Sequence, residues 1–157
     1  MVNCKFQNIF FVLITVILVG CTSTEECRED RTVKLKIGIY TKSTPTDKAF
    51  TIDSVWVNGL ENDSFLYQNS KTITTLKFPL NATRNQSDFI CRFNNITDTV
   101  SVFYTNNNAY FISLACGTIT AHTIDEVIST NHFIDSVRIV QRLIINVDAE
   151  HIKILHN

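Results

Sequence analysis

Thr99-Val100-Ser101-Val102-Phe103-Tyr104 is the stretch that decides the fold class, because Val100, Val102 and Tyr104 recur at every second position. A period of two is the pattern of a β-strand with one buried face. The same period occurs just upstream in 87–93, where Cys91 is in phase with Phe89 and Phe93. We therefore expect two neighbouring strands, joined by a polar loop at 94–98.

Similar short stretches continue in both directions from this pair. The expected strands are 31–41, 50–57, 63–67, 72–80, 87–93, 99–104, 110–116, 118–124, 133–140, 142–147 and 150–155, with 133–147 forming either one long strand or two. Turns are expected at Asn58-Gly59 and at Asn106-Asn107-Asn108, and one helical turn at 125–129. Many short strands without a long helix predict an all-β fold, an antiparallel β-sandwich that is immunoglobulin-like in the broad sense. A small closed β-barrel is the alternative.

The first residues predict export. Lys5 precedes Ile9–Val19, an apolar run that is typical of a secretory signal and too short to span a membrane. The run ends in Leu18-Val19-Gly20-Cys21, which resembles a bacterial lipobox. We therefore expect cleavage before Cys21 and acylation of that cysteine. The alternative is an ordinary cleaved signal followed by a chance cysteine.

This interpretation divides the chain into a signal peptide at 1–20, an acylated cysteine with its tether at 21–30, and a single β-sandwich domain at 31–157. It places the protein in the cell envelope, anchored by lipid to the outer membrane on its periplasmic or its cell-surface face. The membrane is then the first partner. Two or three acyl chains are needed for firm anchoring, because one chain gives only marginal binding.

Charge and short motifs exclude several classes of function. The formal net charge is −1, and removal of Lys5 with the signal makes the mature chain slightly more acidic, so nucleic acid is not an expected partner. The chain has no glycine-rich phosphate loop and no nucleophile elbow, and we expect no cofactor. The histidines, His122, His132, His151 and His156, form no zinc-binding pair, and we expect no metal site and no catalytic residue. Asp53, Asp63, Asp98 and Asp135 lack the dense spacing of a calcium loop.

With Cys21 acylated, Cys27, Cys91 and Cys116 allow one disulfide at most. The phase of Cys91 predicts a buried free thiol, because a free cysteine behaves as a small apolar residue. A Cys27–Cys116 bridge would fasten the tail to the domain and is the pairing that we favour. The alternative is that all three thiols are reduced and packed.

One tripeptide recurs, as Asp53-Ser54-Val55, Asp98-Thr99-Val100 and Asp135-Ser136-Val137. It resembles an O-glycosylation acceptor of secreted bacterial proteins, which makes Ser54, Thr99 and Ser136 candidate sites for a sugar. The alternative is that this sequence is simply how a strand leaves a turn.

The order of features resembles a family of uncharacterised Bacteroidota lipoproteins, known only as a domain of unknown function. The resemblance rests on Cys27 soon after the lipobox, on Leu76–Leu80, on Asp98–Tyr104 with Ile112–Gly117, and on the closing Ile152–Ile154. It covers most of the mature chain. It implies a Cys27–Cys116 bridge, since paired cysteines at these positions are a feature of the family. It implies no activity.

We therefore expect a non-enzymatic binding or accessory module with an envelope protein or a glycan as partner. A small hydrolase with a dispersed site and a passive structural envelope protein are the alternatives. Trp56 is expected in the core. Phe103 and Phe111, out of phase with the inward residues of their strands, are the candidates for an exposed aromatic patch.

Overall fold

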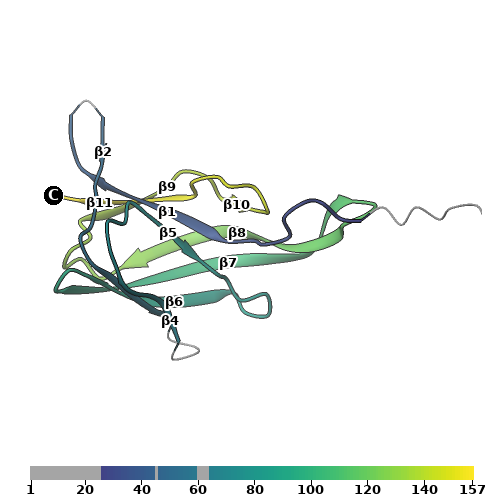
Figure 1. The fold of residues 1–157 in the computed structure, drawn as a ribbon, viewed down its shortest axis with the longest axis horizontal. Coiled ribbons are helices and arrows are strands. Elements are labelled where there is room, and N and C mark those ends of the chain that lie inside the picture. Colours follow the sequence, from purple (N-terminus) through teal and green to yellow (C-terminus); the bar gives the residue numbers. More distant parts are fainter. Residues whose placement is uncertain (1–25, 45, 60–63) are drawn as a thin grey trace, which may run out of the picture.

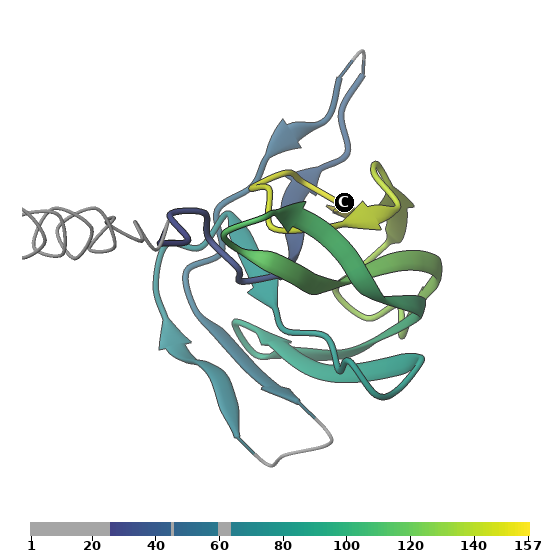
Figure 2. The same cartoon turned by 90° about the vertical axis from the view of Figure 1, so that its right-hand side faces the viewer.

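The computed structural model describes residues 26–44, 46–59 and 64–157, and these residues contain strands and no helix. Eleven strands have bounds β1 Leu35–Thr41, β2 Lys48–Ala49, β3 Val55–Gly59, β4 Phe65–Ser70, β5 Thr75–Phe78, β6 Gln86–Phe93, β7 Ile96–Ser113, β8 Gly117–Ser129, β9 Ser136–Ile139, β10 Leu143–Ile144 and β11 Ile152–His156. They form two curled sheets in a sandwich-like arrangement, a half-barrel when viewed along the long axis (Figure 2). The predicted all-β fold is confirmed.

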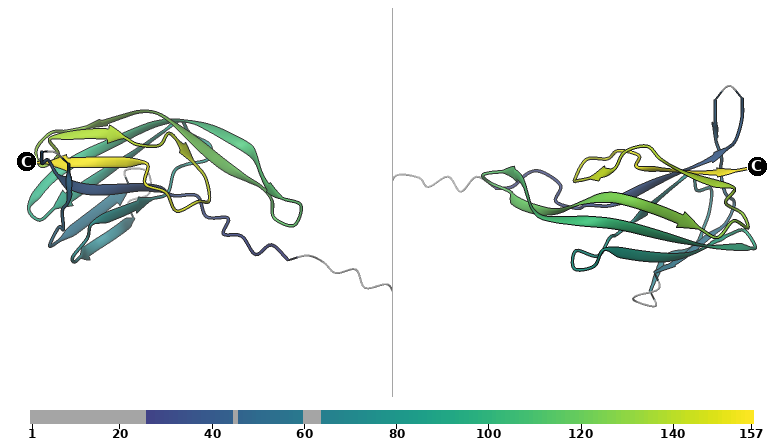
Figure 3. Two further views of the ribbon diagram at one scale, coloured as in Figure 1. Left: turned by 90° about the horizontal axis from the view of Figure 1, so that it is seen from above. Right: turned by 180° about the vertical axis from the view of Figure 1, so that it is seen from behind.

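The larger sheet has the order β10-β8-β7-β6-β3-β4 and is antiparallel throughout. Its centre is the stretch from which the sequence argument began: Val100 lies opposite Phe89, and Val102 lies opposite Ser87. The β7–β8 hairpin is the longest element and extends well beyond the sandwich (Figures 1 and 3).

The smaller sheet has the order β2-β1-β11-β9, and β5 also pairs with β1. Its β1–β11 pair is parallel, with Ile37 opposite Ile152 and Ile39 opposite Ile154. This pair is the exception to the predicted antiparallel pairing. It joins the first and the last of the described strands, so the smaller sheet brings together segments from the two ends of the fold.

The core lies between the two sheets and is built from the in-phase residues of each strand. Leu35, Ile37 and Ile39 from the smaller sheet face Val100 and Val102 from the larger one, all with no exposed surface. Burying an aliphatic side chain of this size contributes about 1.5–3 kcal/mol. β5 carries Leu76 and Phe78 into the same core and ends before Pro79, in keeping with its place at a sheet edge.

Several predicted turns are wrong, because strand pairing overrides local turn preference. Asn106-Asn107-Asn108 lies inside β7, and 125–129 continues β8 instead of forming a helical turn. The β6–β7 loop shrinks to a turn at Asn94-Asn95, where Asn94 has a φ of 54°. Asn58-Gly59 lies within β3, paired with β6. Asparagine tolerates turns but does not require them.

Trp56 is not a core residue. Val55 and Val57 fill the inward positions of β3, so Trp56 lies on the outer face of the sheet, half-buried. There the Phe65 ring meets it edge-on, with centroids 5.7 Å apart, and the guanidinium of Arg92 lies 4.7 Å from its ring centroid. The indole therefore packs on the sheet surface under a cation.

Candidate functional site

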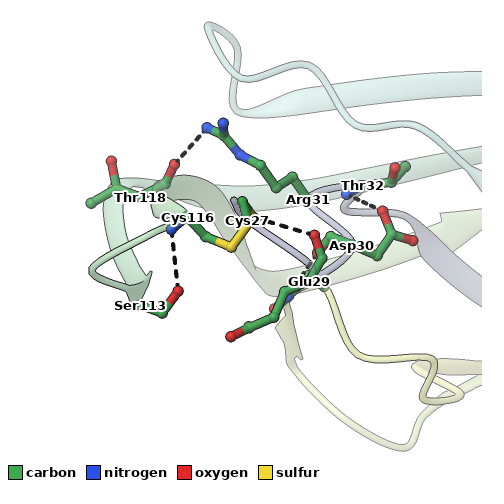
Figure 4. Close-up of a disulfide and its surroundings, with 9 residues drawn as sticks. Cys27, Glu29, Asp30, Arg31, Thr32, Ser113, Cys116 and Thr118 are labelled. Carbon is green, nitrogen blue, oxygen red and sulfur yellow. Dashed lines mark hydrogen bonds between the residues drawn. A yellow bond between two sulfur atoms is a disulfide. The ribbon is translucent and has the colours of Figure 1, made fainter. Parts of the chain in front are cut away.

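The first described residues are fastened to the far end of the β7–β8 hairpin by a Cys27–Cys116 disulfide (Figure 4). The two cysteines are 89 residues apart in sequence, and their Cα atoms are 4.6 Å apart. We call this the tail–hairpin junction; it comprises the tail, residues 27–33, and the hairpin tip, residues 110–119. The bridge that the sequence favoured is thus present.

Three hydrogen bonds reinforce the junction. The Arg31 guanidinium donates to the carbonyl of Thr118 at 3.2 Å, and the Asn146 amide donates to the carbonyl of Asp30 at 2.8 Å. The carboxylate of Asp30 accepts from the backbone N–H of Thr32 at 2.8 Å, which holds a local turn. That N–H bond is the main reason why the pKa of Asp30 lies below its ordinary value. The tail is therefore positioned before it enters β1.

The hairpin turns at Leu114-Ala115-Cys116, and Gly117 follows with a φ of +70°. This left-handed conformation suits glycine, which has no Cβ to clash. The turn directs Cys116 inward, where it is buried, and directs Leu114 outward, where it is 94% exposed. The same local geometry thus forms the bridge and presents an apolar side chain.

A shallow groove runs beside the junction, bounded by the tail, the loop after Pro79 and the β7–β8 hairpin. Its volume is about 490 Å³. The lining residues are Arg31, Val33, Leu80, Ala82, Asn108, Thr118, Ile119, Thr120 and His122. Hydroxyl, amide and guanidinium groups alternate there with aliphatic ones. Such a surface suits an extended ligand that presents both polar and apolar groups.

His122 is a satisfied histidine of the groove floor. Its Nδ1 lies 2.6 Å from the Oδ1 of Asn106, and its ring meets Tyr104 edge-on at 5.2 Å. Burial lowers the pKa of His122, so the ring is neutral at pH 7.

Asp98 is the most densely bonded carboxylate of the described residues. One oxygen accepts from Thr130 Oγ1 at 2.8 Å and from the backbone and ring of His132 at 2.9 and 3.1 Å. The other oxygen accepts from the backbone N–H groups of Phe133 and Ile134, at 2.7 and 2.9 Å. Burial alone raises the pKa of Asp98, but the hydrogen bonds from 130–134 outweigh it and hold the pKa below its ordinary value.

Sequence reasoning missed this role and placed Asp98 in a loop. The available signal was its phase, since Asp98 alternates with Val100, Val102 and Tyr104 and therefore points inward. An acid at an inward position needs donors around it. His132, by contrast, has a side chain that is 67% exposed, so the Asp98–His132 contact lies at the surface.

The candidate O-glycosylation residues lie on three different strands or strand starts. Ser54 precedes β3 and its Oγ donates to the Oδ1 of Asn69 at 2.9 Å. Thr99 lies within β7, and Ser136 is the first residue of the edge strand β9. All three are half-buried.

The remaining predicted residues do not converge on one site. Cys91 is a free, buried thiol whose pKa is raised by burial, as its phase predicted. Asp135 pairs with Lys42 at 3.5 Å, while Cys21 and Asp63 lie outside the described residues. Within the described ranges, no three His, Cys, Asp or Glu side chains are grouped to hold a metal ion. No helix there is long and apolar enough to cross a membrane.

The two candidate patch residues are also apart. Phe103 is half-buried on the outer face of the larger sheet, opposite Gln86 and Glu126. Phe111 is 58% exposed near the hairpin tip. Eight positions of β7 separate them, which corresponds to about 25 Å at the rise of a strand. They do not form one aromatic patch, and of the two only Phe111 lies in the hairpin tip with Leu114.

Comparison with known proteins gives a family and no function. A family model described as "Family of unknown function (DUF6452)" matches residues 54–156, which is most of the described domain. No curated protein and no solved structure matches the chain.

Proposed function

Because the chain belongs to the DUF6452 family, whose function is unknown, we propose a role from its own residues. It is a lipid-anchored protein of the bacterial cell envelope, held at the outer membrane through Cys21, and its sandwich is a non-enzymatic binding or accessory module. We expect the protein to come from the Bacteroidota, because it resembles uncharacterised lipoproteins of that group.

The Cys27–Cys116 disulfide is the observation that carries the proposal. Disulfides persist in oxidising compartments such as the bacterial periplasm and the cell surface, and are rare in the cytosol. This one lies six residues after Cys21, the cysteine of Leu18-Val19-Gly20-Cys21. The disulfide supports export, and a cysteine directly after a signal peptide supports anchoring.

The use of buried polar groups favours binding over catalysis. The carboxylate of Asp98 accepts hydrogen bonds from the backbone N–H groups of residues 132–134, and His122 is hydrogen-bonded to Asn106. His151 accepts the backbone N–H of Lys36 at its Nδ1, at 3.0 Å. Each of these groups stabilises the fold, whereas a catalytic base must be available to a substrate. The groove beside the junction offers surface for an envelope protein or a glycan.

Labelling with an alkyne-tagged fatty acid tests the anchor. We expect label on the wild-type chain and on Cys4→Ala, since Cys4 lies in the removed signal, and none on Cys21→Ala. Label that persists in Cys21→Ala, or that is absent from the wild type, overturns the anchor. An intact mass spectrum of the mature chain also reports any sugar on Ser54, Thr99 or Ser136.

A pull-down from membranes in mild detergent tests the accessory role, with an unrelated lipoprotein as control. A partner that copurifies in near-stoichiometric amount supports an accessory subunit. Recovery of the protein alone contradicts that role and favours a passive structural protein of the envelope.

A further inference from the structure

The hairpin tip is apolar, uncharged and prominent. Leu114 is 94% exposed and Phe111 is 58% exposed, and both lie at the far end of β7–β8. Between Asp98 and Asp125 the chain has no Lys, Arg, Asp or Glu. Single exposed apolar residues are common on soluble proteins. Two of them on a hairpin end that has no charged residue of its own mark an apolar surface. The charged tail borders this surface on the side of the disulfide, where Arg31 donates to the carbonyl of Thr118.

The disulfide ties this tip to the start of the domain. Cys116 is two residues from Leu114, and its partner Cys27 is six residues from Cys21. Six residues span at most about 20 Å when fully extended. Whatever holds Cys21 therefore holds Cys27 within that distance. The bridge adds 4.6 Å between Cα atoms, and the two residues from Cys116 to Leu114 add at most about 7 Å, so the tip stays within about 30 Å of Cys21.

The shape of the molecule indicates which end of the domain faces the anchoring surface. The hairpin tip and the first described residues lie together at one end of the long axis, and the chain's C-terminus lies at the other end (Figures 1 and 3). If the tail rises from a surface, the tip is the part of the domain that faces that surface, and the sandwich points away from it.

We propose that the hairpin tip is a lipid-contacting element, in which Leu114 and Phe111 enter the interfacial region of the membrane beside the acylated cysteine. The inference rests on the proposed anchoring of Cys21 and deepens it. The Cys27–Cys116 bridge then orients the domain, because it holds the anchor and a second membrane contact together. The lipid anchor keeps the tip at a high effective concentration near the membrane, so that an apolar contact too weak to bind by itself is still formed.

The contact is apolar rather than electrostatic. Residues 26–31 carry three acidic side chains, Glu26, Glu29 and Asp30, and two basic ones, Arg28 and Arg31, which gives no basic excess for anionic lipids. Added salt is therefore expected to leave the tip contact unchanged, unlike the contact of a polybasic segment.

The test uses the full mature lipoprotein in phosphatidylcholine vesicles, with brominated acyl chains as quencher. Trp56, the single tryptophan, is first removed as Trp56→Phe. Leu114→Trp then places the reporter at the tip. Ile128→Trp is the matched control, since Ile128 is 50% exposed and lies near the other end of β8. We expect a blue-shifted emission and several-fold stronger quenching for Leu114→Trp than for Ile128→Trp.

The outcomes separate the inference from the anchor on which it rests. If the protein is acylated and floats with the vesicles, but both reporters are quenched equally, the tip contact is overturned and the anchor stands. A blue shift without quenching shows that protein covers the tip, for example a second copy, and also overturns it. A chain without an acyl group on Cys21 overturns both. Cys27→Ser with Cys116→Ser frees the tip from the anchor, and we expect quenching to fall.

Discussion

Replacing Asp98 with alanine tests whether one buried carboxylate holds the turn at 130–134. The alanine variant removes the acceptor of five hydrogen bonds from Thr130, His132, Phe133 and Ile134. Phe133 and Ile134 are buried residues, so their N–H groups lose their acceptor away from bulk water. The donors of His132 are open to solvent and lose little.

The magnitude follows from the two buried donors. A buried donor without a partner costs about 1–3 kcal/mol, and hydrogen bonds to a charged group are at the strong end of the range. We therefore expect Asp98→Ala to lower the free energy of unfolding by about 3–5 kcal/mol, a large part of the roughly 5–15 kcal/mol of a typical domain. Asp98→Asn keeps one acceptor oxygen and should lose less.

Urea unfolding followed by the emission of Trp56 measures this loss, since Trp56 is the only tryptophan. Asp53→Ala is the matched control, because Asp53 begins the same Asp-Ser/Thr-Val tripeptide but is exposed. We expect the control to unfold at the wild-type midpoint. Equal midpoints for Asp98→Ala and Asp53→Ala would refute the view that the Asp98 carboxylate stabilises the turn.

Two further predictions concern the smaller sheet and the buried histidines. A Cβ on Gly38 would lie 2.6 Å from the Tyr40 ring and would overlap the Glu150 carboxylate. We therefore expect Gly38→Ala to cost about 1–3 kcal/mol of stability. Gly59→Ala is the control and should cost far less, because the space around its Cβ is open. Unchanged thermal midpoints for Gly38→Ala would contradict this packing. Burial lowers the pKa of His122 and of His151 from 6.5, so the unfolded chain binds more protons below that pH. The urea concentration at the unfolding midpoint should therefore decrease as the pH is lowered from 7.5 to 5.5. A midpoint that does not change with pH would count against neutral buried histidine rings.

Some parts of the candidate site could be predicted from the sequence and others could not. The Cys27–Cys116 pairing was within reach of the sequence, because the phase of Cys91 left two cysteines and the family resemblance supported their bridge. The groove was not, since the tail, the loop after Pro79 and β8 meet only in three dimensions. The exposure of Leu114 was also hidden, because the strand expected at 110–116, with Phe111 on its outward face, puts Leu114 on its inward face.

The sequence by itself determined the fold class and the inward face of most strands. Alternation is a local property, so Leu35, Ile37 and Ile39, or Val100, Val102 and Tyr104, reveal their buried face without knowledge of their neighbours. The same alternation predicted that Cys91 is buried as a free thiol.

Only the tertiary structure decided where strands end and which strands meet. Local turn signals at 106–108 lost to the ladder that β7 forms with β8, and the parallel β1–β11 pair joins the two ends of the domain. Pairing energy is gained between segments that are distant in sequence, and no local pattern records it. The cysteine pairing was predictable, but the position of the bridge at the tip of a long hairpin was not, because the hairpin and the tail meet across 89 residues of sequence.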